Sequence, residues 1–211
     1  MRILHLFSIF WLSISLSANS PVLNKDSITY PEVGLEGMVV TQHYLASEVG
    51  EAILNKGGNA YDATIAVAFA LAVVLPRAGN IGGGGFTVLY NSSDESFQSL
   101  DYREKAPLAA SKNMYLDKNG DVISNLSTLG YKAIAVPGTV DGMWELHKKY
   151  GSMDWKELIA PSIKLAKEGF KVSPLMADTL NRNYKSLSKF SETKKIFFQE
   201  KLSIHSYFFL K

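Results

Sequence analysis

Apolar residues recur with helical spacing in HYLASEVGEAILNKGGNA, residues 43–60. The positions that fall on one face of such a helix are Leu45, Val49, Ala52 and Ile53. The glycine pair at residues 57–58 is typical of a helix end, because glycine accepts the left-handed backbone found there. The pattern therefore predicts an amphipathic helix that buries this face.

A second, alanine-rich helix is predicted directly after the first. Asn59 can cap it, and Asp62 lies in its first turn, where a negative charge favours the positive end of the helix dipole. The apolar run ATIAVAFALAVVLP, residues 63–76, suits a helix packed on all sides, and Pro76 marks its exit. This run is too short to span a bilayer.

Short runs of β-forming residues lie on both sides of this helical region. GMVV, residues 37–40, is apolar and predicts a buried strand. FTVLY and FQSLDY, separated by the turn-forming NSSDES, predict a hairpin with a loose loop over residues 86–102. MYLDKNGDVIS, residues 114–124, predicts a second hairpin around DKNG.

From residue 137 onward the pattern becomes helical. Thr139 is expected to cap a helix that ends at Gly151, and Asp154 is expected to cap the next one. Pro161 is expected in the first turn of a further helix, where its missing N–H does no harm, and Ser173 opens another. Strand, two helices, hairpins and a run of helices give a mixed α+β fold without regular βαβ alternation.

Composition and charge narrow the classes of function. The 211 residues are 46% hydrophobic and 20% charged, which is an ordinary globular composition with room for one full core or part of a larger one. A net charge of +2 implies no nucleic-acid partner. Because there are no cysteines, zinc clusters, iron–sulfur centres, disulfide frameworks and cysteine nucleophiles are excluded.

The first twenty residues, MRILHLFSIFWLSISLSANS, have the layout of a secretory signal peptide. Arg2 precedes an apolar stretch, and small residues follow at positions 15–20. We expect a signal peptide at residues 1–18, an extended arm at 19–36 and a periplasmic or secreted mature chain. An uncleaved anchor helix or a wrongly assigned start is the alternative.

Four consecutive glycines in NIGGGG, residues 80–85, are costly in backbone entropy. A phosphate-binding P-loop needs a lysine after the last glycine, where Phe86 stands. A dinucleotide-binding loop follows a strand and precedes a helix, whereas this run follows a predicted helix and precedes a predicted strand. Both phosphate-binding interpretations fail, which leaves a close approach of two backbone segments.

Metal sites find little support in the sequence. DKNGDVISNLST, residues 117–128, begins like a calcium-binding loop, but Val122 and Thr128 stand where that loop requires glycine and glutamate, so a plain turn is favoured. The histidines lack partners at metal or triad spacing, and we interpret His43 and His147 as helix-end or surface residues.

A sharper candidate is SLDYREKAP, residues 99–107, where charged residues follow directly on a predicted strand. Residue chemistry alone favours a solvated strand end with mixed charges. The functional alternative is that Arg103, held on the framework of the sheet, grips a substrate carboxylate with two parallel hydrogen bonds. Asp101 or Glu104 would then orient the arginine, or neutralise it when the site is empty.

Several of these stretches, in this order and spacing, make the chain resemble the γ-glutamyltransferases (glutathione hydrolases) over about residues 35–190. They are GMVVTQHYLASEVGEAILNKGGNAYDATIAVAFALAVVLP, GNIGGGGFTVLY, LDYREKAP, VPGTVDGMWELHKKYG and LIAPSIKLAKEGFKVSP. The resemblance implies an N-terminal-nucleophile hydrolase fold with α-β-β-α layers. It also implies an exported precursor that cuts itself into two subunits, and a threonine nucleophile that passes a γ-glutamyl group from glutathione to water or an amino acid.

Within this chain the resemblance assigns one substrate contact. Arg103 matches the arginine that binds the α-carboxylate of the γ-glutamyl group in the family, and Asp101 and Glu104 match positions that shape that site. No catalytic residue, metal ligand or cofactor is expected. The glycine run matches the family's entry into a central strand, so valine at Gly83 or Gly84 is expected to block folding or self-cleavage in a full-length relative.

Family members are much longer, and their nucleophile and oxyanion-binding glycines belong to a C-terminal part without a counterpart here. We expect residues 37–190 to be the N-terminal part of the large subunit and 191–211 to be a divergent tail. The expected partners are glutathione or another γ-glutamyl compound and the missing small-subunit chain. An inactive truncated fragment, one half of a split enzyme and a non-catalytic γ-glutamyl-binding remnant remain open.

Overall fold

The computed structural model describes residues 33–198 and 209–210 of the chain. The predicted signal peptide, most of the predicted arm and much of the predicted tail lie outside these residues. The chain divides into two units, residues 1–36 and 37–211. Residues 33–36 of the first unit belong to no helix or strand, and all elements below lie in the second unit.

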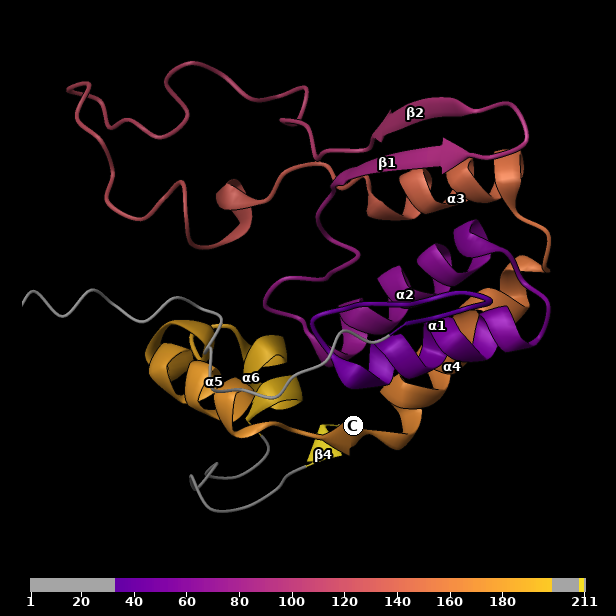
Figure 1. Cartoon of the computed structure of the whole chain (residues 1–211). Coiled ribbons are helices and arrows are strands. Elements are labelled where there is room, and N and C mark those ends of the chain that lie inside the picture. Colours follow the sequence, from indigo (N-terminus) through magenta and orange to yellow (C-terminus); the bar gives the residue numbers. More distant parts are fainter. Residues whose placement is uncertain (1–32, 199–208, 211) are drawn as a thin grey trace, which may run out of the picture. The chain divides into compact units, whose positions relative to one another are not determined.

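Helices dominate the second unit (Figure 1). The elements include a short 3₁₀-helix, η1, and in chain order they are α1 (Tyr44–Asn55), α2 (Ala60–Val74), β1 (Phe86–Asn91), β2 (Ser96–Asp101), η1 (Tyr131–Ala133), α3 (Thr139–Tyr150), α4 (Trp155–Glu168), β3 (Phe170–Lys171), α5 (Pro174–Leu187), α6 (Ser191–Phe197) and β4 (Phe209–Leu210). β1 pairs antiparallel with β2, and β3 with β4. The mixed α+β class is confirmed.

The alanine-rich helix α2 is the centre of the packing. It contacts α1, α3 and α4, and Figure 1 shows it between α3 and the other two. Its buried side chains include Ile65, Ala66 and Val74, which are at most 1% exposed. Small side chains let three helices approach one axis, which confirms the prediction of a helix surrounded by protein. Among the described helices, none is long and apolar enough to traverse a bilayer.

Helix α1 is capped by His43, which the sequence indicated only as a helix-end or surface residue. The Nδ1 atom of His43 accepts a hydrogen bond from the Leu45 N–H at 3.3 Å, and the helix ends before Gly57, whose φ is 91°. The buried stripe contains Gly50 and Ile53, but the predicted Ala52 is exposed. The stripe is shifted because α1 approaches α2 at Gly50, where a Cβ atom would lie 2.7 Å from Val67 Cγ2.

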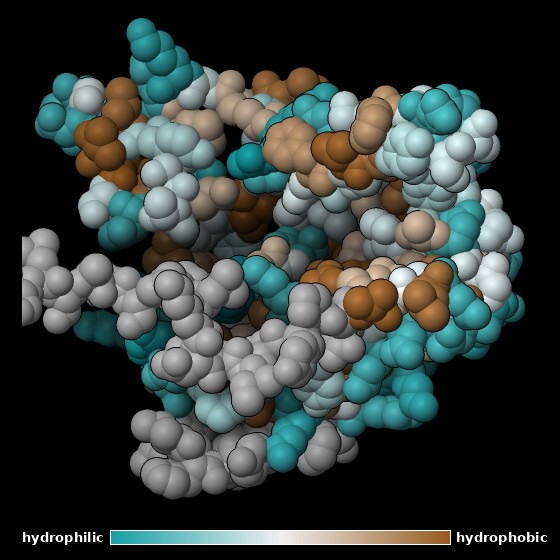
Figure 2. Space-filling view, in the orientation of Figure 1, coloured by the Kyte–Doolittle hydropathy of each residue, from teal (hydrophilic) through white to brown (hydrophobic). Residues whose placement is uncertain are grey.

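The predicted hairpin is confirmed, with Phe86 opposite Asp101 and Asn91 opposite Ser96. One face packs into the core through Leu89, which is 8% exposed. The other face carries a row of exposed apolar side chains: Phe86, Val88, Tyr90 and Phe97. Hydrophobic residues, shown in brown, reach the surface at several places in Figure 2. The hairpin is therefore covered on one side only within the described residues.

One predicted strand and one predicted hairpin are wrong. Residues 37–40 form no strand, and Met38 and Val40 are 53% and 82% exposed. No described segment pairs with this run, and an apolar run without a partner strand has no ladder to join. Residues 114–124 form a turn closed by a single bridge, Leu116 to Val122, rather than a hairpin.

The C-terminal helices follow their predicted caps, with two differences. Thr139 is the first helical residue of α3 rather than its cap, a position that Gly138 occupies. Pro161 lies inside α4, which runs without interruption from its Asp154 cap. The helix continues through the proline because Leu158, which is fully buried, anchors it to the core beside α2. Ser173 caps α5 as predicted.

Candidate functional site

Arg103 comes two residues after the end of β2 and has an exposed side chain. Its guanidinium Nε lies 3.3 Å from Glu104 Oε1, and its Cζ lies 6.0 Å from the centre of the Phe86 ring. The side chain is 61% exposed, so the cation has one carboxylate neighbour and one aromatic neighbour and remains open to solvent. A planar guanidinium in this setting can donate hydrogen bonds to the carboxylate of a ligand in addition to Glu104.

The backbone that carries Arg103 is held more firmly than its side chain. The Tyr102 N–H donates to Gly85 O at 3.0 Å, and the Arg103 N–H donates to Asp101 Oδ1 at 2.9 Å. Lys105 exchanges two backbone hydrogen bonds with Val136, at 3.1 and 2.8 Å. Four hydrogen bonds over four residues fix where the arginine side chain starts, since an exposed loop without them would be free to move.

Two glycines make room for this backbone. A Cβ atom on Gly84 would lie 2.5 Å from Glu104 N and closer still to Tyr102 O, and one on Gly138 would overlap the same Tyr102 oxygen. The glycine loop, residues 80–85, and the start of α3 therefore meet the Tyr102–Arg103 backbone with no space for a side chain. The interpretation of the glycine run as a packing element is confirmed.

The two acidic neighbours of Arg103 have different contacts. Glu104 pairs with the guanidinium, whereas Asp101 accepts from the backbone. The pKa of Glu104 lies below its ordinary value, first because its own N–H donates to the carboxylate and further because Arg103 is near. Glu104 is therefore ionised at neutral pH and balances the arginine charge. The sequence left open which acid does this.

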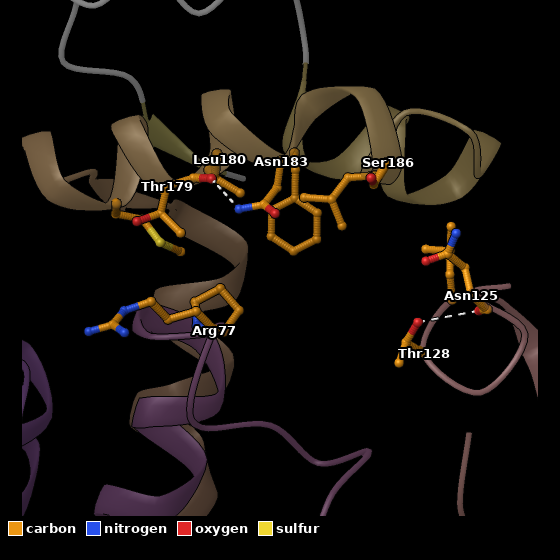
Figure 3. A pocket seen from close by; sticks show the side chains of 12 residues that line it. Arg77, Asn125, Thr128, Thr179, Leu180, Asn183 and Ser186 are labelled. Atoms are coloured by element: carbon orange, nitrogen blue, oxygen red, sulfur yellow. Dashed lines mark hydrogen bonds between the residues drawn. The ribbon is translucent and has the colours of Figure 1, made fainter. Parts of the chain in front are cut away.

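Arg103 lines neither of two cavities formed by the described residues. One, of about 510 Å³, lies between α5, the residue 125–129 loop and Pro76. In Figure 3 the guanidinium of Arg77 points away from Asn125 and Thr128, and Asn183 donates to the Thr179 carbonyl. The other, of about 420 Å³, lies between the start of α2 and β1. Arg103 is an exposed surface residue outside these two cavities.

The described residues contain no group of three or more histidine, cysteine, aspartate or glutamate side chains placed to hold a metal ion. Asp117 Oδ1 instead accepts the backbone N–H groups of Asn119 and Asp121, at 2.8 and 3.0 Å, which confirms the turn interpretation. His43 is a helix cap, as predicted. His147 is more buried than expected, with Nε2 2.9 Å from Met153 O.

Sequence reasoning missed two residues of this site, Gly138 and Thr139, as partners of the glycine loop. The Thr139 hydroxyl donates to Asn80 O at 3.1 Å, and both residues donate backbone N–H groups to Gly83 O. Their sequence signal, PGT before a helix, predicts only a helix start. The contacts join segments more than fifty residues apart, which no local pattern reveals.

Comparison with known proteins identifies the family. The family model for gamma-glutamyltranspeptidase matches residues 46–209. The glutathione hydrolase proenzymes of Pseudomonas sp. strain A14 and Pseudomonas aeruginosa are 48% and 55% identical over 184 and 137 residues, which is 87% and 65% of this chain. These matches cover 32% and 24% of the two proenzymes, so the chain spans about a third or less of the curated relatives it matches.

Solved structures of gamma-glutamyltranspeptidases have a fold similar to that of this chain. The gamma-glutamyltranspeptidase of Helicobacter pylori superposes with a TM-score of 0.79 at 48% identity, covering 82% of this chain and 49% of that one. That of Pseudomonas nitroreducens, complexed with L-DON, gives 0.75 at 44% identity and covers 80% and 50%. The mixed helices and sheet correspond to about half of those N-terminal-nucleophile hydrolase chains. The chain thus belongs to the γ-glutamyltranspeptidase family.

Proposed function

We propose that this chain carries the carboxylate-binding part of a γ-glutamyltransferase site, with Arg103 as the residue that binds the α-carboxylate of a γ-glutamyl compound such as glutathione. The observation that carries the proposal is an exposed guanidinium on a backbone fixed by glycine contacts on both sides. Preorganisation of this kind lowers the entropy lost when a ligand is bound.

Arg103 already has a charged partner, which such a ligand would displace. Glu104 neutralises Arg103 through a pair whose members are 31% and 61% exposed, so the pair is worth little by itself. A substrate carboxylate that makes two parallel hydrogen bonds to the guanidinium competes favourably with this single contact. Phe86 at 6.0 Å adds an attractive aromatic face to the cation.

Catalysis is proposed for the complete family chain rather than for these residues alone. The relatives are named glutathione hydrolases, and the match covers about a third of their length or less. We place the threonine nucleophile and the oxyanion-stabilising glycines in the remaining part, where the family resemblance puts them. Gripping a carboxylate without nucleophile or oxyanion donors leaves the acyl-transfer barrier almost unchanged.

Calorimetric titration with glutathione tests the binding proposal. We expect the chain to bind and Arg103→Ala to weaken binding at least tenfold, because one partner of a charge-assisted contact is lost. Arg182→Ala is the matched control, since Arg182 is an exposed arginine on α5 paired with Asp178 at 2.9 Å. Equal affinities of the wild type and Arg103→Ala would refute the proposal.

A chromogenic γ-glutamyl anilide tests the catalytic proposal. The purified 211-residue chain is expected to release no anilide above the buffer rate, because binding alone supplies no nucleophile. Turnover that depends on Arg103 would show that these residues hold a complete site, and the assignment of catalysis to the rest of the family chain would be wrong.

A second candidate is that the chain is one half of a split enzyme. The exposed row of Phe86, Val88, Tyr90 and Phe97 favours it, since such a face is suited to contact further polypeptide. Co-expression with the unmatched remainder of the Pseudomonas aeruginosa proenzyme tests it. Recovery of anilide turnover in the mixture supports the candidate, and an inactive mixture that copurifies as a complex argues against it.

We also propose that residues 1–18 are an export signal and that the mature chain, comprising an arm to residue 36, the family segment 37–190 and a tail 191–211, is periplasmic or secreted. The observation is the Arg2, apolar and small-residue layout of the N-terminus. Mass spectrometry of the chain purified from the periplasm of an expression host is expected to show cleavage after residues 17–20. A full-length cytoplasmic product would contradict this proposal.

A further inference from the structure

Helix α3 begins at the same place where the glycine loop crosses the backbone of Arg103. The carbonyl of Gly83 accepts from the N–H groups of Gly138 and Thr139, at 2.8 and 3.1 Å. The Thr139 hydroxyl donates to the Asn80 carbonyl at 3.1 Å. The first residues of α3 thus bind both ends of the segment from residue 80 to residue 83.

This segment leads directly into the contact with the arginine. Gly84, the next residue, lies against the Tyr102 carbonyl and the Glu104 N–H, and Gly138 lies against the same Tyr102 carbonyl from α3. The Tyr102–Arg103 backbone therefore lies between the glycine loop and the start of α3, and Thr139 connects these two segments by a hydrogen bond. A shift of the loop away from α3 would release one wall of this enclosure.

Thr139 has the features of a residue selected for this contact rather than for exposure at a helix start. It is only 9% exposed, and its hydroxyl is the only side-chain group that binds the loop from α3 within the described residues. Its neighbour Val140 is 45% exposed. The Asn80 carbonyl loses this partner if the hydroxyl is removed, which weakens the attachment of the loop to α3.

We infer that Thr139 is a positioning residue for the binding of the γ-glutamyl carboxylate. Its hydroxyl joins the glycine loop to α3 by a hydrogen bond and thereby sets the position of Arg103. This inference rests on the proposed function of Arg103. Thr139 does not touch the ligand, and its effect on binding passes through Asn80, the glycine loop and the Tyr102–Arg103 backbone.

The test compares Thr139→Val, which removes the hydroxyl at similar volume, with Thr139→Ser, which keeps it, in the full chain. Val140→Ala is the control for unrelated changes in the same turn. Two quantities are measured: the glutathione dissociation constant, and the ¹⁵N heteronuclear NOE of the Arg103 Nε–Hε group. The NOE peak is assigned as the one missing in Arg103→Lys.

We expect Thr139→Val to raise the dissociation constant about three- to tenfold, the effect of losing one hydrogen bond, and to lower the NOE of Arg103. Thr139→Ser is expected to keep both the dissociation constant and the NOE at their wild-type values, and Val140→Ala is expected to change neither. A role in stability alone would lower the unfolding midpoint of Thr139→Val and leave the order of the arginine side chain unchanged.

Two results would overturn the inference: an Arg103 NOE in Thr139→Val equal to that of the wild type, or a Thr139→Ser variant that behaves like Thr139→Val. If the wild type does not bind glutathione, the proposed function fails, whereas the NOE comparison still decides whether Thr139 positions Arg103. The failures of the two proposals are therefore distinguishable.

Discussion

The glycines of the glycine loop differ in what surrounds them. At Gly84 an added Cβ would meet backbone atoms of residues 102–104, which can move only if the segment carrying Arg103 moves. At Gly83 it would meet only the side chain of Asn80, at 2.9 Å, and at Gly82 nothing lies closer than 3.6 Å. The sequence predicts the same steric role for Gly83 and Gly84, whereas in the structure only Gly84 of these two lies against another backbone segment.

Gly84→Ala is therefore expected to reduce the free energy of unfolding by about 2–4 kcal/mol, because backbone must shift to admit the methyl group. Gly82→Ala is the matched control and is expected to stay within about 0.5 kcal/mol of the wild type. Urea unfolding followed by circular dichroism measures both. Equal midpoints for the two variants would contradict the packing role of Gly84.

Asp62 connects two distant parts of the core. Its side chain is fully buried, forms the capping box with Asn59, and accepts the Ser152 hydroxyl at 2.5 Å and the Ser152 N–H at 3.0 Å. The sequence predicted its place in the first turn of α2. The contact with the turn between α3 and α4 was not predictable, because it depends on a residue ninety positions away.

Asp62→Asn is expected to lower the free energy of unfolding by about 2–4 kcal/mol, since an amide group cannot accept all of these donors. The exposed Asp121→Asn is the control. Thermal or urea unfolding at neutral pH compares the two. The role of Asp62 would be contradicted by a loss no larger than that of the control.

The same residue predicts a pH dependence. Burial alone would raise the pKa of Asp62, but hydrogen bonds from Ser152, Asn59 and Met153 outweigh it and bring the pKa below its ordinary value. The folded state then binds the proton more weakly than the unfolded chain does. Asp62 thus stabilises the fold fully above the unfolded-chain pKa of about 3.9, and this contribution disappears as the pH falls through the lower folded value.

Urea unfolding measured from pH 6 down to pH 2 is expected to show a steeper loss of stability in the wild type than in Asp62→Asn. Parallel curves for the two proteins would show that Asp62 is not responsible for the acid sensitivity.

At the scale of elements, two serines on neighbouring helices differ in what their hydroxyls do. Ser162, inside α4, is 5% exposed and its Oγ has no hydrogen-bond partner among the described residues. Ser173 caps α5, where its Oγ accepts the Met176 N–H at 3.2 Å. The Ser162 hydroxyl is a buried polar group without a hydrogen-bond partner among the described residues, whereas the Ser173 hydroxyl caps the N-terminus of α5.

Opposite effects are expected from the same substitution. Ser162→Ala is expected to leave stability unchanged or to increase it by up to about 1 kcal/mol, whereas Ser173→Ala is expected to decrease it by about 1 kcal/mol. Chemical denaturation of both variants checks the sign. A destabilised Ser162→Ala would mean that its hydroxyl has a partner that stabilises the fold.

Helices α1 to α5 were predictable because their signals are local: apolar spacing for α1, an alanine-rich run for α2, and capping residues such as Asn59, Asp154 and Ser173. Helix α6 lies in the predicted tail and was not predicted. The strand predicted at residues 37–40 failed because a strand needs a partner that the sequence does not name. Pro161 was expected to begin a helix, but the fully buried Leu158 and the packing against α2 carry α4 through it.

At the scale of the whole molecule, the hairpin has an apolar face that no part of residues 33–198 covers. Val88 and Phe97, which are 78% and 77% exposed, are expected to bind a hydrophobic dye and to promote self-association. Replacing both with threonine, which keeps a strand-forming residue, is expected to reduce dye fluorescence and light scattering without unfolding the chain. Unchanged scattering in the double variant would contradict an apolar contact surface at this hairpin.

The fold class could be predicted from the order of the elements and from the family resemblance. The same resemblance assigns the candidate carboxylate site to Arg103, which residue chemistry alone did not favour. The way Arg103 is held could not be predicted, because Gly84, Gly138 and Thr139 come together only when the hairpin, the glycine loop and α3 are packed. Its partner Glu104 was one of two candidates, and only the side-chain geometry separates it from Asp101.

The most direct test of the central proposal pairs a change in the protein with a change in the ligand. Calorimetry would compare the wild type and Arg103→Ala, each with glutathione and with γ-aminobutyryl-cysteinylglycine, which lacks only the α-carboxylate. We predict that removing the carboxylate costs the wild type at least tenfold in affinity and costs Arg103→Ala nothing further. The same loss of affinity in both proteins would contradict the account.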